Sequence, residues 1–208
     1  MRHTWIKITA IIPIWLFIAK AAIQYSLLTI VTQQRNSLLQ LGIGGLTMLV
    51  PAIIYKDEIC KAVMKYKYTD DMIYYTGCLG DSTLMIDNDD DGSLYQYAII
   101  DNDRLIGYFT YAINWYSSCA RNFGLFSFDR NNRIVGIDIY RELKKIINDY
   151  HIHRIEWRMV GGNPVEKHYD KFCNKYHGKK FILTDAIKDR FGKFHDDIIY
   201  EIIFDKEV

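Results

Sequence analysis

The sequence lacks several features that mark common classes of protein. Only three of its 208 residues are proline, and none of its four cysteines lies in the C-x-x-C spacing of zinc ribbons and thioredoxin-like redox motifs. Neither sign of charge dominates, because 26 Lys and Arg are balanced by 25 Asp and Glu. A nearly neutral chain has no overall electrostatic attraction to nucleic acid. We therefore expect reduced cysteines and no nucleic-acid partner.

Hydrophobic and aromatic residues are abundant instead. Half of the residues are hydrophobic, a quarter are charged, and 16 are Tyr. This composition excludes a disordered or low-complexity chain, because enough apolar surface is present to form a core. The aromatic content favours a fold that contains a sheet.

The first 58 residues differ from the rest of the chain. They hold five basic and two acidic residues, and residues 38–55 carry no charge at all. Residues 5–31 are also mostly apolar, so each stretch is long enough to cross a bilayer as a helix of about 20 residues. Flanking Lys and Arg would place both ends in the cytoplasm. Three interpretations are open: a two-helix membrane hairpin, a single anchor or loosely packed extension, and a soluble helical pair that covers the other domain.

We divide the chain into an apolar, helical extension (1–58) and a second domain (59–208). In the second domain, strands are expected where β-branched and aromatic residues cluster between turn residues, at 95–100, 105–114, 123–128, 154–160, 181–186 and 198–204. Apolar residues at helical spacing predict a helix over 134–147, with Arg141, Glu142, Lys144 and Lys145 on its solvent side. A second helix is expected between Pro164 and Gly178. This order of elements predicts an α/β (α+β) fold with one mixed central sheet.

One part of this pattern resembles the GCN5-related N-acetyltransferase (GNAT) family. The resemblance lies in a strand, the segment 133–138, an amphipathic helix, another strand, Asn163 and a helix that carries Tyr169. It covers about residues 66–205. The family's phosphate-binding loop reads Gln/Arg-x-x-Gly-x-Gly/Ala, and Arg133 and Gly136 fit its first and fourth positions. Asp138 departs from the small residue at the sixth position, and its carboxylate would repel a phosphate unless it points away.

The resemblance implies that acetyl-CoA is the acyl donor, with no metal. Its pyrophosphate would bind the backbone N–H groups at the start of the helix. These groups are accessible only if no Cβ blocks them, which is a physical reason for glycine at position 136, Gly136. Arg133 would add charge-assisted hydrogen bonds. The alternative is an ordinary strand-to-helix turn. The expected coenzyme-binding residues are Phe128, Arg133, Ile134, Val135, Gly136, Ile137 and Asn163. The pantetheine arm is expected in a gap between the strands that end near Asp129 and Val160.

The resemblance also implies that Tyr169 protonates the departing thiolate. The phenol suits this role, since its pKa of about 10 keeps it protonated at neutral pH. Tyr169 follows Asn163 one residue earlier than in the family, which would rotate it by about 100° on the helix. Alternatively, Tyr169 is only an aromatic residue on the apolar face of the helix, and Tyr176 is the reserve candidate for the acid. For the general base we name Asp129 first and Glu156 second, although either is equally well a solvated carboxylate.

The resemblance implies direct acetyl transfer to a primary amine, such as a cationic small molecule, a lysine side chain or an N-terminal amine. No basic residue lies between Lys67 and Arg104, while nine Asp do. These acids either form a negative wall that attracts a cationic amine or are a solvated loop. The alternative functions are an inactive GNAT-fold binding module and a membrane-tethered interaction protein, with membrane contact through residues 1–58. We expect a cytoplasmic catalytic domain and make no prediction of its oligomeric state.

Two motifs that suggest a metal are incomplete. The acidic run from Asp87 to Gly92 matches the first half of a calcium-binding EF-hand loop. The position that must supply a bidentate Glu is occupied by Ala98. His151 and His153 alternate along the chain, but no third ligand lies nearby in the sequence. No metal site is therefore expected.

Overall fold

The structure is a computed structural model that describes residues 48–75, 84–86, 92–129 and 132–204. The chain divides into two compact units, Met1–Leu46 and Thr47–Val208, and every described element belongs to the second. Most of the expected extension (1–58) therefore lies outside the described residues. Within the described part of the chain, no helix is long and apolar enough to cross a membrane.

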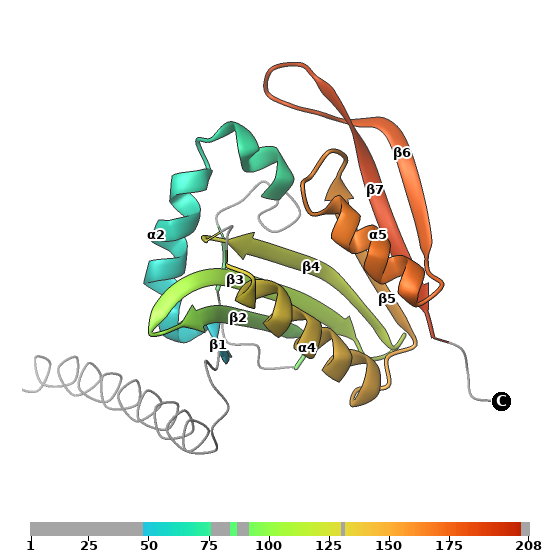
Figure 1. The fold of residues 1–208 in the computed structure, drawn as a ribbon, viewed down its shortest axis with the longest axis horizontal. Coiled ribbons are helices and arrows are strands. Elements are labelled where there is room, and N and C mark those ends of the chain that lie inside the picture. Colours follow the sequence, from blue (N-terminus) through green and yellow to red (C-terminus); the bar gives the residue numbers. More distant parts are fainter. Residues whose placement is uncertain (1–47, 76–83, 87–91, 130–131, 205–208) are drawn as a thin grey trace, which may run out of the picture. The chain divides into compact units, whose positions relative to one another are not determined.

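A seven-stranded mixed sheet forms the centre of this unit, with strand order β1-β2-β3-β4-β5-β7-β6 (Figure 1). Neighbouring strands are antiparallel except for β4 and β5, which are parallel. The strands are β1 (Met48–Pro51), β2 (Leu94–Asp101), β3 (Arg104–Asn114), β4 (Cys119–Ser127), β5 (Arg154–Val160), β6 (Lys179–Lys188) and β7 (Phe194–Ile203). The helices are η1 (Ala52–Tyr55), α2 (Lys56–Tyr66), η2 (Asp70–Tyr75), α4 (Ile134–Asn148) and α5 (Glu166–Lys175). The expected α/β fold with one mixed sheet is confirmed.

The β2–β3 hairpin shows how local sequence sets this topology. Its two turn residues, Asn102 and Asp103, have φ values of 47° and 62°. Asn and Asp tolerate this left-handed conformation better than other residues with a side chain. A two-residue turn of this kind matches the right-handed twist of the paired strands. The turn therefore brings two apolar strands into register at the centre of the sheet.

Helices α4 and α5 lie on the same face of the sheet (Figure 1). The buried stripe of α4 consists of Val135, Asp138, Glu142 and Ile146. The prediction that Glu142 lies on the solvent side is wrong. Its carboxylate accepts a hydrogen bond from the Tyr111 hydroxyl, at 2.7 Å, and lies 3.4 Å from the Tyr97 hydroxyl. Burial and the adjacent Glu142 charge raise the pKa of Tyr97 to about 12.

The opposite face of β3 and β4 packs against α2 and η2 through aromatic rings. Tyr75 stacks on Phe126 with ring centroids 4.4 Å apart, and Tyr66 lies 6.2 Å from Phe128. Ile59 and Val63 are the buried residues on the inner side of α2. The described residues before position 59, which we assigned to the extension, form β1, η1 and the first turn of α2. Since β1 pairs with β2, the segment 48–58 belongs to the sheet unit rather than to a separate extension.

Candidate functional site

Strands β4 and β5 separate soon after they meet. Their pairing consists of Cys119 with Arg154 and Ala120 with Ile155, although β4 continues to Ser127 and β5 to Val160. Beyond these pairs the facing backbone groups of the two strands are not bonded to each other. An extended ligand can use such groups as an added strand does. The structure therefore confirms the gap expected between these strands (Figure 1).

The loop after β4 leads directly into the start of α4. Asn132 holds this junction: its Oδ1 accepts the Ile134 N–H at 3.0 Å, and its Nδ2 donates to Asp101 at 3.1 Å. We did not predict this role, although Asn just before an apolar helical pattern is a recognised capping signal. The N–H groups of Val135 and Gly136 have no carbonyl partner within the helix, because the first turn of any helix lacks one.

Gly136 lies exposed in this first turn. A Cβ built on it would meet no atom within 4 Å, so packing of the protein does not require glycine here. Glycine inside a helix costs about 1 kcal/mol relative to alanine. The space beside Gly136 therefore suits a bound group. Arg133 and Ile137 are also exposed, whereas Ile134 is half-buried and Val135 is buried.

Asp138 does not share the exposed surface of Gly136. Two residues along a helix correspond to a rotation of about 200°, which turns Asp138 toward the sheet. Its side chain is 4% exposed and lies 3.2 Å from the Arg141 guanidinium. The departure from the family loop at this position thus places a carboxylate inside the protein rather than against a phosphate.

The start of α5 follows β5 through a glycine turn. Gly162 has a φ of 82°, in the left-handed region that favours glycine. The Oδ1 of Asn163 accepts the Val165 N–H at 3.2 Å, and Glu166 Oε2 accepts the Gly162 N–H at 3.3 Å. Asn163, predicted to bind the pantetheine arm, thus holds the turn that leads from β5 into α5.

Tyr169 lies half-buried on the side of α5 that faces β5 and β7. Its ring makes edge contacts with Trp157 and Tyr200, at centroid distances of 6.0 and 6.1 Å. Trp157 lies two residues beyond the last β5 residue that pairs with β4, so Tyr169 packs over the separated part of β5. Tyr176, the reserve candidate, packs instead against Phe172 and Phe204 at the end of α5.

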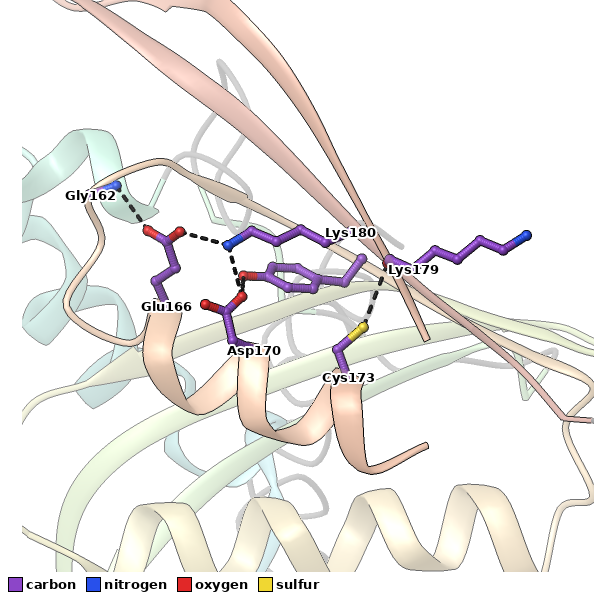
Figure 2. A network of polar contacts seen from close by, with 7 residues as sticks. Gly162, Glu166, Asp170, Cys173, Lys179 and Lys180 are labelled. Atoms are coloured by element: carbon purple, nitrogen blue, oxygen red, sulfur yellow. Dashed lines mark hydrogen bonds and ion pairs between the residues drawn. The ribbon is translucent and has the colours of Figure 1, made fainter. Parts of the chain in front are cut away.

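A polar network fixes α5 to the β6–β7 hairpin (Figure 2). Lys180 Nζ lies 2.9 Å from Glu166 Oε1 and 2.8 Å from Asp170 Oδ1, and the Tyr200 hydroxyl donates to Asp170 at 2.7 Å. The hydrogen bonds from Lys180 and then Tyr200 hold the pKa of Asp170 below its ordinary value. Burial, followed by the bond to Asp170, raises the pKa of Tyr200. Because Tyr169 adjoins Asp170, this network also holds Tyr169 in place.

Both candidate bases are ion-paired. Asp129 lies 2.6 Å from the Arg104 guanidinium, and Glu156 pairs with Arg154. Glu156 alternates along β5 with Trp157, so it faces the other side of the sheet from α5. Phe128, expected among the coenzyme-binding residues, directs its ring into the aromatic cluster of Tyr66 and Phe126.

The expected acidic wall is only partly described. Asp70 pairs with Arg190 of the β6–β7 turn, and Asp101 accepts a hydrogen bond from Asn132. Most of the other acids, including the run from Asp87 to Asp91, lie outside the described residues. Among the residues that are described, no group of three His, Cys, Asp or Glu side chains is arranged to hold a metal ion.

Comparison with known proteins supports the fold. No family model and no curated protein sequence matches the chain. Among solved structures, an N-acetyltransferase from Staphylococcus aureus Mu50 is similar, with a TM-score of 0.54 and 17% identity. The match covers 76% of this chain and 98% of that one. A weaker likeness, at a TM-score of 0.45 and 18% identity, is to the spermidine/spermine N-acetyltransferase SpeG from Vibrio cholerae, covering 55% of this chain and 67% of that one. The chain thus has the fold of the GCN5-related N-acetyltransferases, as the sequence resemblance predicted.

Proposed function

We propose that the chain is an acetyl-CoA-dependent N-acetyltransferase that acts on a primary amine. The observation that carries this proposal is the separation of β4 from β5 beside the start of α4, where Gly136 leaves open space. Together these features provide unbonded strand edges for an extended arm and N–H groups for an anion.

In the proposed complex, the first-turn N–H groups of α4 bind the pyrophosphate of the coenzyme. These groups carry the positive end of the helix dipole, and the first turn, Ile-Val-Gly-Ile, contains no acid. The exposed Arg133 precedes this turn and adds a second positive charge. The pantetheine arm then lies between β4 and β5, which brings the thioester toward Trp157 and Tyr169.

The reaction is direct acyl transfer. The acceptor ammonium first gives a proton to a base, and the resulting amine attacks the thioester carbon. A C–N bond forms as the C–S bond breaks, Tyr169 gives its proton to the departing thiolate, and the proton that the nitrogen then loses returns to the Tyr169 phenolate. We keep Asp129 and Glu156 as candidate bases. One oxygen of each carboxylate is bonded to its arginine partner, so the other oxygen would have to accept the proton.

The second candidate function is a coenzyme-binding module without catalysis. The arginine partners of Asp129 and Glu156 favour it, since each guanidinium occupies a carboxylate oxygen that would otherwise be open to the proton of the amine. The two functions differ in turnover but not in coenzyme binding.

Turnover of the full chain with acetyl-CoA tests the proposal. Release of coenzyme A thiol is followed with a panel of amines that includes a polyamine, an aminoglycoside and a lysine-containing peptide. We expect one class of amine to accelerate thiol release. The acetylated product should be heavier than that amine by about 42 Da, the mass of the CH₂CO unit that the transfer adds. Binding of coenzyme A without turnover on any amine supports the binding module instead.

A further inference from the structure

The end of the β2–β3 hairpin is bonded to the turn that leads into α4. Asp101, the last residue of β2, and Arg104, the first residue of β3, face each other in register. Arg104 Nη2 donates to Asp129 Oδ2 at 2.6 Å. Asp101 Oδ2 accepts a hydrogen bond from Asn132 Nδ2 at 3.1 Å, and the Asn132 N–H donates to the Asp129 carbonyl at 3.1 Å. The hairpin therefore holds the turn before α4 at both of its ends.

The side-chain amide of Asn132 joins Asp101 to the helix. Its Nδ2 donates to Asp101, while its Oδ1 accepts the Ile134 N–H at 3.0 Å. An amide has one donor end and one acceptor end, whereas an ionised carboxylate only accepts. Asp101 therefore selects the NH₂ end of the amide and leaves the oxygen for Ile134. If the amide turned round, its NH₂ group would meet the Ile134 N–H, donor against donor.

This link acts on the first turn of α4, which begins at Ile134. Arg133, which occupies the N-cap position in the described part of the loop, makes no cap bond with its side chain. The Asn132 side chain supplies that bond instead, and helix ends fray where such bonds are lost. A site built from backbone N–H groups binds an anion best when these groups are already in place, because ordering them on binding reduces the affinity.

We propose that Asp101 is a positioning residue of the coenzyme site, which acts through Asn132 on the first turn of α4. This inference rests on the function proposed above, since the first turn affects turnover only if it binds the pyrophosphate. The charge of Asp101 works against that binding, because a carboxylate repels a phosphate. Loss of the charge alone would strengthen coenzyme A binding, whereas loss of the positioning bond weakens it. The two effects therefore have opposite signs and can be told apart.

Calorimetric titration of coenzyme A into the full chain separates them. Asp101→Ala removes the charge and the bond, and its affinity should fall by about fivefold or more, the effect of losing one helix cap. Asp101→Asn removes the charge but keeps an acceptor for Asn132, so it should bind at least as tightly as the wild type. Asn102→Gly is the control, because it removes the other hydrogen bond to the Asp101 carboxylate and keeps the left-handed turn. It should bind as the wild type does.

Hydrogen exchange of the Ile134 amide, followed by NMR in the free chain, tests the link without the coenzyme. Exchange should be faster by about fivefold or more in Asp101→Ala and in Asn132→Ala, and unchanged in Asp101→Asn. Because Asp101 acts only through Asn132, adding Asp101→Ala to Asn132→Ala should reduce neither the coenzyme A affinity nor the protection of this amide any further. Urea unfolding checks that each variant is folded.

Three results would overturn the proposal while coenzyme A still binds the wild type. The first is an Asp101→Ala variant that binds coenzyme A as tightly as the wild type or more tightly. The second is an equal loss of affinity in Asp101→Ala and Asp101→Asn, and the third is unchanged exchange of the Ile134 amide in Asp101→Ala. A folded wild type that binds no coenzyme A would instead refute the proposed function, and the coenzyme role of Asp101 with it.

Discussion

Helices α4 and α5 lie on the same face of the sheet but begin in different ways. The first turn of α5 holds the negative charge of Glu166, and the N–H groups that Asn163 and Glu166 accept, from Val165 and Gly162, lie just before the helix. The start of α4 has a side-chain cap only at Ile134, from Asn132, and its first turn holds no acid. At α5 the protein compensates the helix dipole, whereas at α4 it leaves the positive end open beside Gly136.

This difference separates a structural helix start from one suited to an anionic ligand. At α5 the Lys180 network fixes the helix to the β6–β7 hairpin. At α4 the helix is fixed by its buried stripe, to which the exposed Gly136 does not contribute. Variants that make the α4 start resemble the α5 start should therefore remove ligand binding without weakening the fold.

Gly136→Glu should have the largest effect. It adds an acid to the first turn of α4, in the space beside the proposed phosphate. Coenzyme A affinity should fall at least 100-fold, by repulsion and by loss of space. Stability should rise by about 1 kcal/mol, because glycine is removed from a helix and the dipole gains a negative partner. Calorimetric titration and urea unfolding measure the two effects. Lys144→Glu, which adds a negative charge later on α4, is the control and should bind coenzyme A as the wild type does. Unchanged coenzyme A affinity in Gly136→Glu would refute the proposed phosphate site.

Tyr169→Phe tests the residue that packs over the separated part of β5. The substitution keeps the ring contacts with Trp157 and Tyr200 but removes the proposed proton donor. The turnover number should fall at least tenfold, in line with general acid catalysis, while acetyl-CoA affinity changes less than twofold. Tyr176→Phe is the matched control and should keep full turnover. An active Tyr169→Phe with an impaired Tyr176→Phe would assign the acid to the reserve candidate.

Tyr111→Phe tests the buried stripe of α4 separately from its start. The Tyr111 hydroxyl bonds to the buried Glu142 carboxylate, which would lose this donor. A buried acceptor that loses its partner costs about 1–3 kcal/mol of folding stability. Urea unfolding should show this loss, while coenzyme A affinity stays unchanged. Tyr116→Phe, at a fully exposed tyrosine, should leave stability unaltered.

The smallest effect is expected at Asp170. Because its pKa is held below the ordinary value in the folded chain, its charged form stabilises the fold above that value. The contribution should be at most about 1 kcal/mol, as for partly exposed ion pairs. It should disappear as the pH falls below about 4. A double-mutant cycle of Asp170→Asn and Lys180→Met, measured by urea unfolding across pH, checks this. Coupling that persists in acid would contradict the assignment.

Local patterns predicted much of the fold. The hairpin of β2 and β3, the helix α4 and the strand β5 each follow from turn residues or from apolar spacing over a short stretch of chain. Strand β1 was not predicted, because an uncharged apolar run such as 38–55 is typical of both a helix and a buried strand. The burial of Glu142 was missed for a different reason: its partner Tyr111 lies 31 residues away, and a charged residue beside Arg141 and Lys144 usually faces solvent.

The candidate site was predicted in outline only. The resemblance pointed to the α4 start and to the gap between β4 and β5, and the fold has both. The arginine partners of Asp129 and Glu156 were not predicted. Arg104 lies 25 residues before Asp129, and the pairing depends on how the β2–β3 turn meets the loop after β4. The Lys180 network likewise joins two elements that no local spacing connects.

The most direct test of the α4 start compares coenzyme A with pantetheine, which lacks the pyrophosphate, in calorimetric titrations of the full chain. We expect coenzyme A to bind at one site per chain with micromolar affinity and pantetheine to bind at least 100-fold more weakly. Equal affinities, or no binding of coenzyme A to a demonstrably folded chain, would contradict the assignment of the α4 start as a pyrophosphate site.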